Sequence, residues 1–219
     1  MSLRLVLFDV DGTLTDSQAV ITNAMIHAFE ATGRAAPSRL EMLSVVGLSL
    51  RNVALGLMPD ASPDVIDTWC EAYKTAFHQG GNGHAASPLF AGMREVLEEL
   101  AGQQDTLVGL ATGKGRRGLD GMIAAQALGP LLVTTQCADE HPSKPHPSMV
   151  LAAMAETGVS ANRCVVIGDT RFDLEMAHAA GVKFIAVTWG YHSAALLDGA
   201  DAIVHHPHDI PKAIDTILR

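Results

Sequence analysis

The chain has 219 residues, of which 48% are hydrophobic and 18% charged, as expected of a folded globular protein rather than a disordered chain. Its net charge of −9 argues against a nucleic-acid partner, because such a surface repels phosphate backbones. The three cysteines are widely spaced and match neither a disulfide framework nor a zinc motif, so we expect buried free thiols. The sequence has no apolar run long enough for a membrane span and no secretory leader pattern, which predicts a cytoplasmic protein without a membrane partner.

The N-terminal part of the chain predicts one strand followed by a helical insert. Residues 3–8 are an apolar run typical of a strand buried on both faces of a parallel sheet. From Ser17 onward, apolar residues recur at helical spacing, and Gly33 closes the first helix. Further helices follow without strands until the glycine-rich segment 79–83, which we interpret as a flexible return to the first domain. We therefore predict an all-helical cap domain over residues 16–86.

Beyond the insert, helices and strands alternate along the chain. The predicted helices cover 92–101, 116–127, 147–157 and 171–180, and the predicted strands cover 106–111, 131–134, 164–167 and 183–187. Such alternation predicts an α/β fold with a Rossmann-like parallel sheet and helices on both faces, formed by residues 1–15 and 87–219. Folds of this kind place their chemistry beyond the carboxyl ends of the strands.

Residues suited to phosphate chemistry follow these predicted strands. They are Asp9 and Asp11 after the first strand, Thr112, Gly113 and Lys114 after the second, Lys144 before a later helix, and Asp169 and Asp173 after residues 164–167. Each element alone has an ordinary explanation, such as a helix cap, a solvated lysine or a carboxylate that complements a helix dipole. Their joint occurrence, in order along one alternating sheet, is far less probable by coincidence than any one of them.

The pattern resembles the haloacid dehalogenase superfamily. The four motifs of that family match Asp9-Val10-Asp11-Gly12-Thr13, Thr112, Lys144 and the segment 168–173. The insert after the first motif is similar to the small mobile cap of phosphoglycolate phosphatases and their relatives. One departure is Gly113, where many relatives carry Ser or Asn, which removes a polar contact while easing the approach of the backbone.

The resemblance implies a role for each matched residue. Asp9 would be the nucleophile that forms an aspartyl-phosphate, and Asp11 would protonate the leaving oxygen and later deprotonate the attacking water. Mg²⁺ would be held by Asp9, the main-chain carbonyl of Asp11 and Asp169. Outside this set, Asp173 would orient Lys144 or a water molecule. Non-bridging phosphoryl oxygens would be bound by Thr112 and Lys144.

Weaker signals come from the cap and from the late loops. Arg51 is the last residue of the segment 47–51, which is similar to the substrate-facing loop of phosphoglycolate phosphatase relatives, and it either pairs with a substrate carboxylate or is a surface arginine. Lys114 either attracts an anionic substrate or is plain surface charge. Trp189-Gly190-Tyr191 also resembles that subgroup and is interpreted as a pocket wall. We interpret His205, His206 and His208 as solvated rather than metal-binding.

These patterns favour a phosphatase for a small anionic phosphomonoester, with 2-phosphoglycolate first and pyrophosphate second. A broad-specificity phosphatase and a β-phosphoglucomutase-like phosphotransferase remain open. Asp11 together with Asp169 argues against a dehalogenase, and a non-catalytic binding protein is disfavoured because every motif residue is present. The expected partner is a small phosphate ester, the expected state a monomer or weak homodimer, and the cap is predicted to close during transfer.

Overall fold

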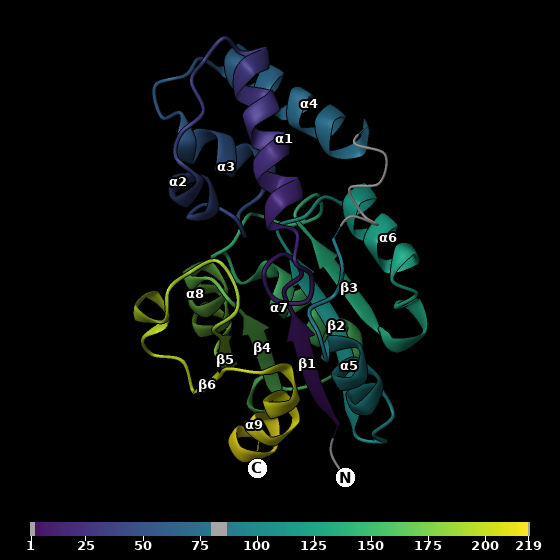
Figure 1. Cartoon of the computed structure of the whole chain (residues 1–219). Coiled ribbons are helices and arrows are strands. Elements are labelled where there is room, and N and C mark those ends of the chain that lie inside the picture. Colours follow the sequence, from purple (N-terminus) through teal and green to yellow (C-terminus); the bar gives the residue numbers. More distant parts are fainter. Residues whose placement is uncertain (1–2, 80–86, 219) are drawn as a thin grey trace.

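The computed structural model describes residues 3–79 and 87–218, which form an α/β core with a helical insert above the carboxyl ends of the strands (Figure 1). All pairings within the sheet are parallel, and the strand order is β3-β2-β1-β4-β5-β6. The strands are β1 (Arg4–Phe8), β2 (Thr106–Thr112), β3 (Thr134–Cys137), β4 (Cys164–Gly168), β5 (Lys183–Val187) and β6 (Ala202–Val204). The predicted fold class is confirmed.

The central strand β1 supplies both hydrophobic layers of the core. Leu5 and Leu7 pack on one side of the sheet, and Val6 and Phe8 pack on the other, because successive side chains of a strand point to opposite faces. The first layer is completed by α7 (Ser148–Thr157) and α8 (Arg171–Ala180). The second is completed by α5 (Met93–Ala101), α6 (Arg116–Ala125) and α9 (Ile210–Ile217). Burial on both faces explains why β1 is almost entirely apolar.

The insert is a helical unit with its own hydrophobic core. It contains α1 (Gln18–Ala31), α2 (Arg39–Leu43), α3 (Leu50–Leu57) and α4 (Pro63–Gln79). Trp69 on α4 is fully buried and meets Phe29 of α1 edge to face, with ring centroids 5.7 Å apart. Of the predicted glycine-rich return, residues 80–83 lie outside the described residues. The domain boundaries at residues 16 and 86 stay predictions.

One predicted strand is shifted along the sequence. Residues 131–134 were expected to form a strand, but Gly129–Leu131 form a 3-10 turn and β3 begins at Thr134. Leu131 and Leu132 reach the core from this turn, whereas β3 itself is an edge strand with polar residues. Gln136 is buried there because its amide donates to the Thr134 hydroxyl at 2.8 Å. The apolar run therefore marked the core contact and not the strand.

Two other expectations concern composition. Cys70, Cys137 and Cys164 are all buried free thiols, as predicted. In the described ranges 3–79 and 87–218, the helices lack the combination of length and apolarity that a membrane span requires.

Candidate active site

The site lies at the carboxyl edge of the sheet, where three neighbouring strands end. Because β1 runs between β2 and β4, Asp9 after β1 is flanked by Thr112 at the end of β2 and by Asp169 after β4. All three side chains are at most 1% exposed. The strand order thus brings together residues that are more than 150 positions apart in the sequence.

Lys144 reaches this edge from the segment after β3 and is buried between two carboxylates. Its Nζ donates to Oδ1 of Asp9 at 2.7 Å and to Oδ1 of Asp173 at 2.6 Å. Burial lowers the pKa of Lys144, but the charges of Asp173 and Asp9 outweigh this effect and raise its pKa above the usual value. Asp173 is fixed in turn because its Oδ2 accepts from the backbone N–H and the hydroxyl of Thr170 at the start of α8.

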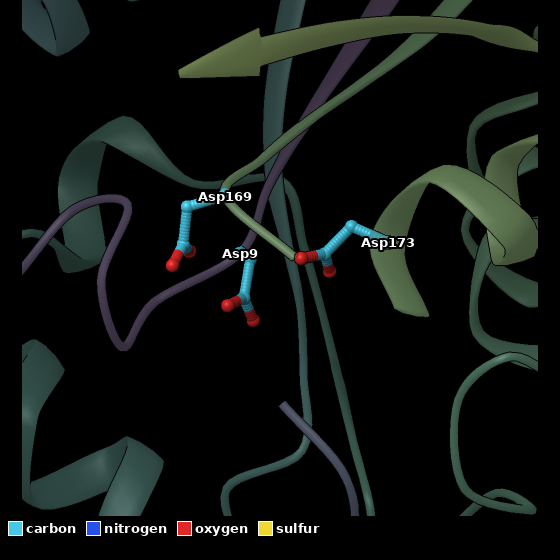
Figure 2. Close-up of side chains that lie close together, drawn as sticks. All are labelled: Asp9, Asp169 and Asp173. Carbon is cyan, nitrogen blue, oxygen red and sulfur yellow. The ribbon is translucent and has the colours of Figure 1, made fainter. Parts of the chain in front are cut away.

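Asp9, Asp169 and Asp173 form a cluster of buried carboxyl groups. Figure 2 shows the three side chains converging, and one oxygen from each lies within 4.8 Å of the others. Burial raises the pKa of Asp9 to about 7, with Lys144 opposing and Asp173 adding to the shift. Burial also raises the pKa of Asp169 well above its ordinary value, and the charges of Asp173 and Asp9 add to this. Such a cluster could hold a metal ion.

Asp169 is held in place by the loops around it. Its Oδ1 accepts from the hydroxyl of Thr13, and its Oδ2 accepts from the backbone N–H of Tyr191, both at 2.8 Å. Gly12 is required beside it for two reasons: its φ of +88° is unfavourable for other residues, and a Cβ there would lie 2.4 Å from Oδ2 of Asp169. Gly12 of the first motif therefore leaves room for the carboxylate of Asp169 in the fourth motif.

The side chain of Asp11 points to different partners. Its Oδ1 accepts from the hydroxyl of Ser17 at 2.7 Å, and its Oδ2 pairs with Nζ of Lys114 at 2.9 Å. The side chain is therefore not part of the carboxylate cluster, which instead contains Asp173. The predicted metal contact of Asp11 involved its main-chain carbonyl and not this carboxylate.

The segment after β2 lies directly under the insert. The backbone N–H of Lys114 donates to the hydroxyl of Thr112 at 3.2 Å. A Cβ on Gly113 would lie 2.4 Å from the carbonyl oxygen of Gly47 and 2.6 Å from that of Leu48. The insert could not dock this closely if residue 113 carried a side chain. Lys114 also contacts the insert, with Nζ 4.9 Å from the ring centroid of Phe77.

A cavity of about 930 Å³ lies between the core and the insert. Asp9, Asp11 and Thr112 line it from the core side, and the insert faces them with a mixture of apolar and charged side chains. Arg51 also lines the cavity, but its guanidinium forms an ion pair with Asp67 and its side chain is 52% exposed. The structure therefore places Arg51 at the same cavity as the other predicted residues, but paired with a carboxylate of the insert.

The remaining sequence signals have structural partners. Trp189 donates from its indole N–H to the carbonyl of Thr13 at 3.1 Å, so the loop after β5 supports the first motif. His205 lies 3.0 Å from the hydroxyl of Thr188 through its Nδ1. Sequence reasoning missed Ser17, although it stands at the junction between the core and the insert, and missed the contact that Tyr191 makes with it.

Comparisons with known proteins identify the family of the chain. Residues 6–187 match the family model described as haloacid dehalogenase-like hydrolase. A probable phosphatase, IndB, from Dickeya dadantii is 34% identical over 90% of this chain and 86% of its own length. A phosphoglycolate phosphatase from Xylella fastidiosa is 30% identical over 94% of this chain and 90% of its own.

Among solved structures, a predicted phosphatase from Clostridium acetobutylicum has the same fold. Its TM-score is 0.87 at 21% identity, and the match covers 99% of this chain and 100% of that one. The predicted family is confirmed. The chain belongs to the haloacid dehalogenase-like hydrolases, and both relatives named above are phosphatases by name.

Proposed function

We propose that the protein is a magnesium-dependent phosphatase that hydrolyses a small anionic phosphomonoester through an aspartyl-phosphate on Asp9. The observation that carries this proposal is the state of the Asp9 carboxylate, which lines the cavity. Its Oδ1 is held by Lys144, whereas its buried Oδ2 has no hydrogen-bond partner among the described residues. A buried oxygen of this kind is unusual in proteins and is available for attack on phosphorus.

The carboxylate cluster fits a magnesium ion by its chemistry. The donors are all oxygen atoms, which Mg²⁺ prefers, and three carboxyl groups carry more negative charge than Lys144 balances. Asp9, Asp169 and the main-chain carbonyl of Asp11 would hold the ion, with Asp173 outside this set orienting Lys144. When bound, the cation offsets the repulsion between the Asp9 carboxylate and the substrate phosphate.

The reaction then proceeds in two displacements. Oδ2 of Asp9 forms a bond to phosphorus as the bond to the leaving oxygen breaks, and Asp11 gives that oxygen a proton. In the second step a water molecule attacks phosphorus, Asp11 takes its proton, and the bond between Asp9 and phosphorus breaks to release phosphate. Thr112 and Lys144 hold the non-bridging oxygens through both steps, which supplies charge stabilisation.

The cavity supports two substrate classes. Lys114 lines the cavity beside Asp11, and its ammonium can face a substrate carboxylate as well as Asp11, which favours phosphoglycolate. Arg51 would have to exchange Asp67 for the substrate. The volume of about 930 Å³ instead favours a larger ester and hence a broad-specificity phosphatase, because pockets of this size commonly hold ligands of drug size.

The test is magnesium-dependent phosphate release from phosphoglycolate, pyrophosphate, sugar phosphates and nucleotides by the wild type and by Asp9→Asn. We expect the variant to be inactive on every substrate. A rate for phosphoglycolate that is orders of magnitude above the others supports a phosphoglycolate-specific enzyme, and similar rates support a broad-specificity phosphatase. Transfer of the phosphoryl group between sugar phosphates without release would indicate a mutase. An active Asp9→Asn would refute the covalent mechanism.

A further inference from the structure

A chain of two hydrogen bonds joins the loop after β5 to the carboxylate of Asp11. The hydroxyl of Ser17 donates to Oδ1 of Asp11 at 2.7 Å, and the hydroxyl of Tyr191 lies 2.9 Å from the same Ser17 oxygen. A serine hydroxyl has one proton, and here that proton is given to Asp11. Tyr191 must therefore donate to Ser17, so the direction of the chain is fixed from Tyr191 to Asp11.

The surroundings of the chain favour this arrangement. Ser17 is fully buried, so water does not compete for its hydroxyl. The phenol of Tyr191 has a proton to donate, since a tyrosine hydroxyl is protonated at neutral pH. The backbone N–H of Tyr191 is bound to Asp169, which fixes the residue that carries the phenol.

We propose that Tyr191 is a positioning residue for Asp11 and acts through the hydroxyl of Ser17. This inference rests on the proposed function, in which Asp11 transfers the proton. A carboxyl group that protonates a leaving oxygen must be held within hydrogen-bond reach of it, and an error of about 1 Å in such a group can cost a hundredfold in rate. Lys114 holds one oxygen of Asp11 from the segment after β2, and Ser17 with Tyr191 holds the other.

The position of Ser17 adds a reason for a second support. Ser17 directly precedes α1 and therefore stands where the chain leaves the core for the insert. A hydroxyl at such a junction would follow any movement of the insert. Tyr191 ties it to a loop that is itself bound to the core through Asp169 and, by way of Trp189, to Thr13. The contact with Tyr191 thus keeps the Asp11 support on the core side.

The test compares two esters that differ in their need for a proton. An alkyl phosphate must be protonated as it leaves, whereas p-nitrophenolate is a stable anion that leaves without a proton. We expect Tyr191→Phe, which keeps the ring and the main-chain contact, to slow release of the leaving alcohol in a single turnover about 3- to 10-fold, the size of one net hydrogen bond. A single turnover is followed because the second displacement, in which Asp11 is the base, is common to both esters. The loss for p-nitrophenyl phosphate should be less than about twofold. KM and the Mg²⁺ concentration for half-maximal activity should not change.

Ser17→Ala supplies a second variant on the same chain. It should show the same selective loss, and the double variant with Tyr191→Phe should be no worse than Ser17→Ala alone, because Tyr191 acts only through that hydroxyl. Equal losses for both esters, no loss for the alkyl ester, or additive losses in the double variant would each overturn the role of Tyr191.

Asp11→Asn distinguishes the two proposals. If it impairs the alkyl ester far more than p-nitrophenyl phosphate while Tyr191→Phe does not, only the positioning role fails. If Asp11→Asn slows release of both leaving groups equally in a single turnover, Asp11 is not the proton donor, and the proposed mechanism and the role of Tyr191 fall together. A wild type without metal-dependent phosphatase activity on either ester would instead refute the proposed function.

Discussion

Replacing Asp169 by Asn should separate the stability of the protein from its affinity for a metal ion. Asp169 is fully buried, and its carboxylate lies within 4.8 Å of those of Asp9 and Asp173. Two like charges at that distance repel by about 3 kcal/mol at an effective dielectric constant of about 20. In the absence of a cation, this repulsion is balanced only in part by Lys144, so the wild type folds against it or takes up a proton, as the raised pKa values of Asp9 and Asp169 indicate.

Asn has nearly the same shape and no charge, so Asp169→Asn should relieve this repulsion. Part of the gain is lost because Thr13 and Tyr191 both donate to residue 169, and an amide offers only one acceptor atom. A net gain of about 1–2 kcal/mol would raise the melting temperature by about 2–8 °C in EDTA. Mg²⁺ at about one hundred times its Kd should stabilise the wild type by about 2.7 kcal/mol, or about 5–10 °C, and the variant by much less.

Thermal unfolding followed by circular dichroism, in EDTA and across a Mg²⁺ titration, measures both effects. Asp120→Asn is the matched control, because this carboxylate lies on the exposed face of α6 and should leave the Mg²⁺ shift unchanged. If Asp169→Asn lowers the melting temperature in EDTA and retains the full Mg²⁺ shift, then Asp169 is neither a source of repulsion nor a metal ligand, and the reasoning is wrong.

Three further substitutions test other parts of the structure. Lys144→Met should lower the free energy of unfolding in urea by about 3–5 kcal/mol, because it leaves buried carboxylates unpaired. The control Lys183→Met, at a partly exposed ion pair, should lower it by less than about 1 kcal/mol. Equal losses in the two variants would contradict the role given to burial. Gly113→Ala should force the loop at Gly47 away, because the added Cβ would overlap its carbonyl oxygen. We expect kcat/KM to fall at least about tenfold with little change in melting temperature. Unchanged kinetics would show that the insert need not dock this closely. His192→Gln tests the pH dependence of stability. Burial lowers the pKa of His192, so the wild type should lose stability as pH falls below about 6.5, and its melting temperature should approach that of the variant. A constant difference in melting temperature from pH 7.5 to 5 would refute this.

The sequence predicted which residues meet at the carboxyl ends of the strands, because the fold leaves little freedom there. In a parallel sheet all carboxyl ends meet at one edge, so residues that directly follow strands, such as Asp9, Thr112 and Asp169, must come together once the strand order is set. The glycine of the first motif was predictable for a similar reason, since only a residue without a side chain fits beside Asp169. The error in the predicted range of the third strand did not affect the predicted grouping of these residues, because that strand lies at the edge of the sheet.

Contacts between side chains from distant segments were not predictable. Ser17 and Tyr191 are 174 positions apart, and neither residue type identifies the other as a partner. Lys114 was expected to attract substrate or to be solvated, but it pairs with Asp11, and Arg51 pairs with Asp67 rather than facing the cavity freely. Such pairings depend on how the insert docks and on side-chain rotamers, neither of which is encoded by spacing along the chain.

In the proposed mechanism, the docking of the insert gives a physical reason why specificity and catalysis would be supplied by different parts of the chain. Two consecutive core residues are among those that the insert contacts: Gly113 lies under the carbonyl of Gly47, and Lys114 lies against the ring of Phe77. These residues directly follow Thr112, which lines the floor of the cavity beside Asp9. A change in the insert therefore alters the space above the phosphoryl site without moving the strand ends that form it. If the sheet positions the phosphoryl site and the insert bounds the space for the leaving group, as proposed, substitutions in the insert should change which ester is hydrolysed while the dependence on Asp9 remains.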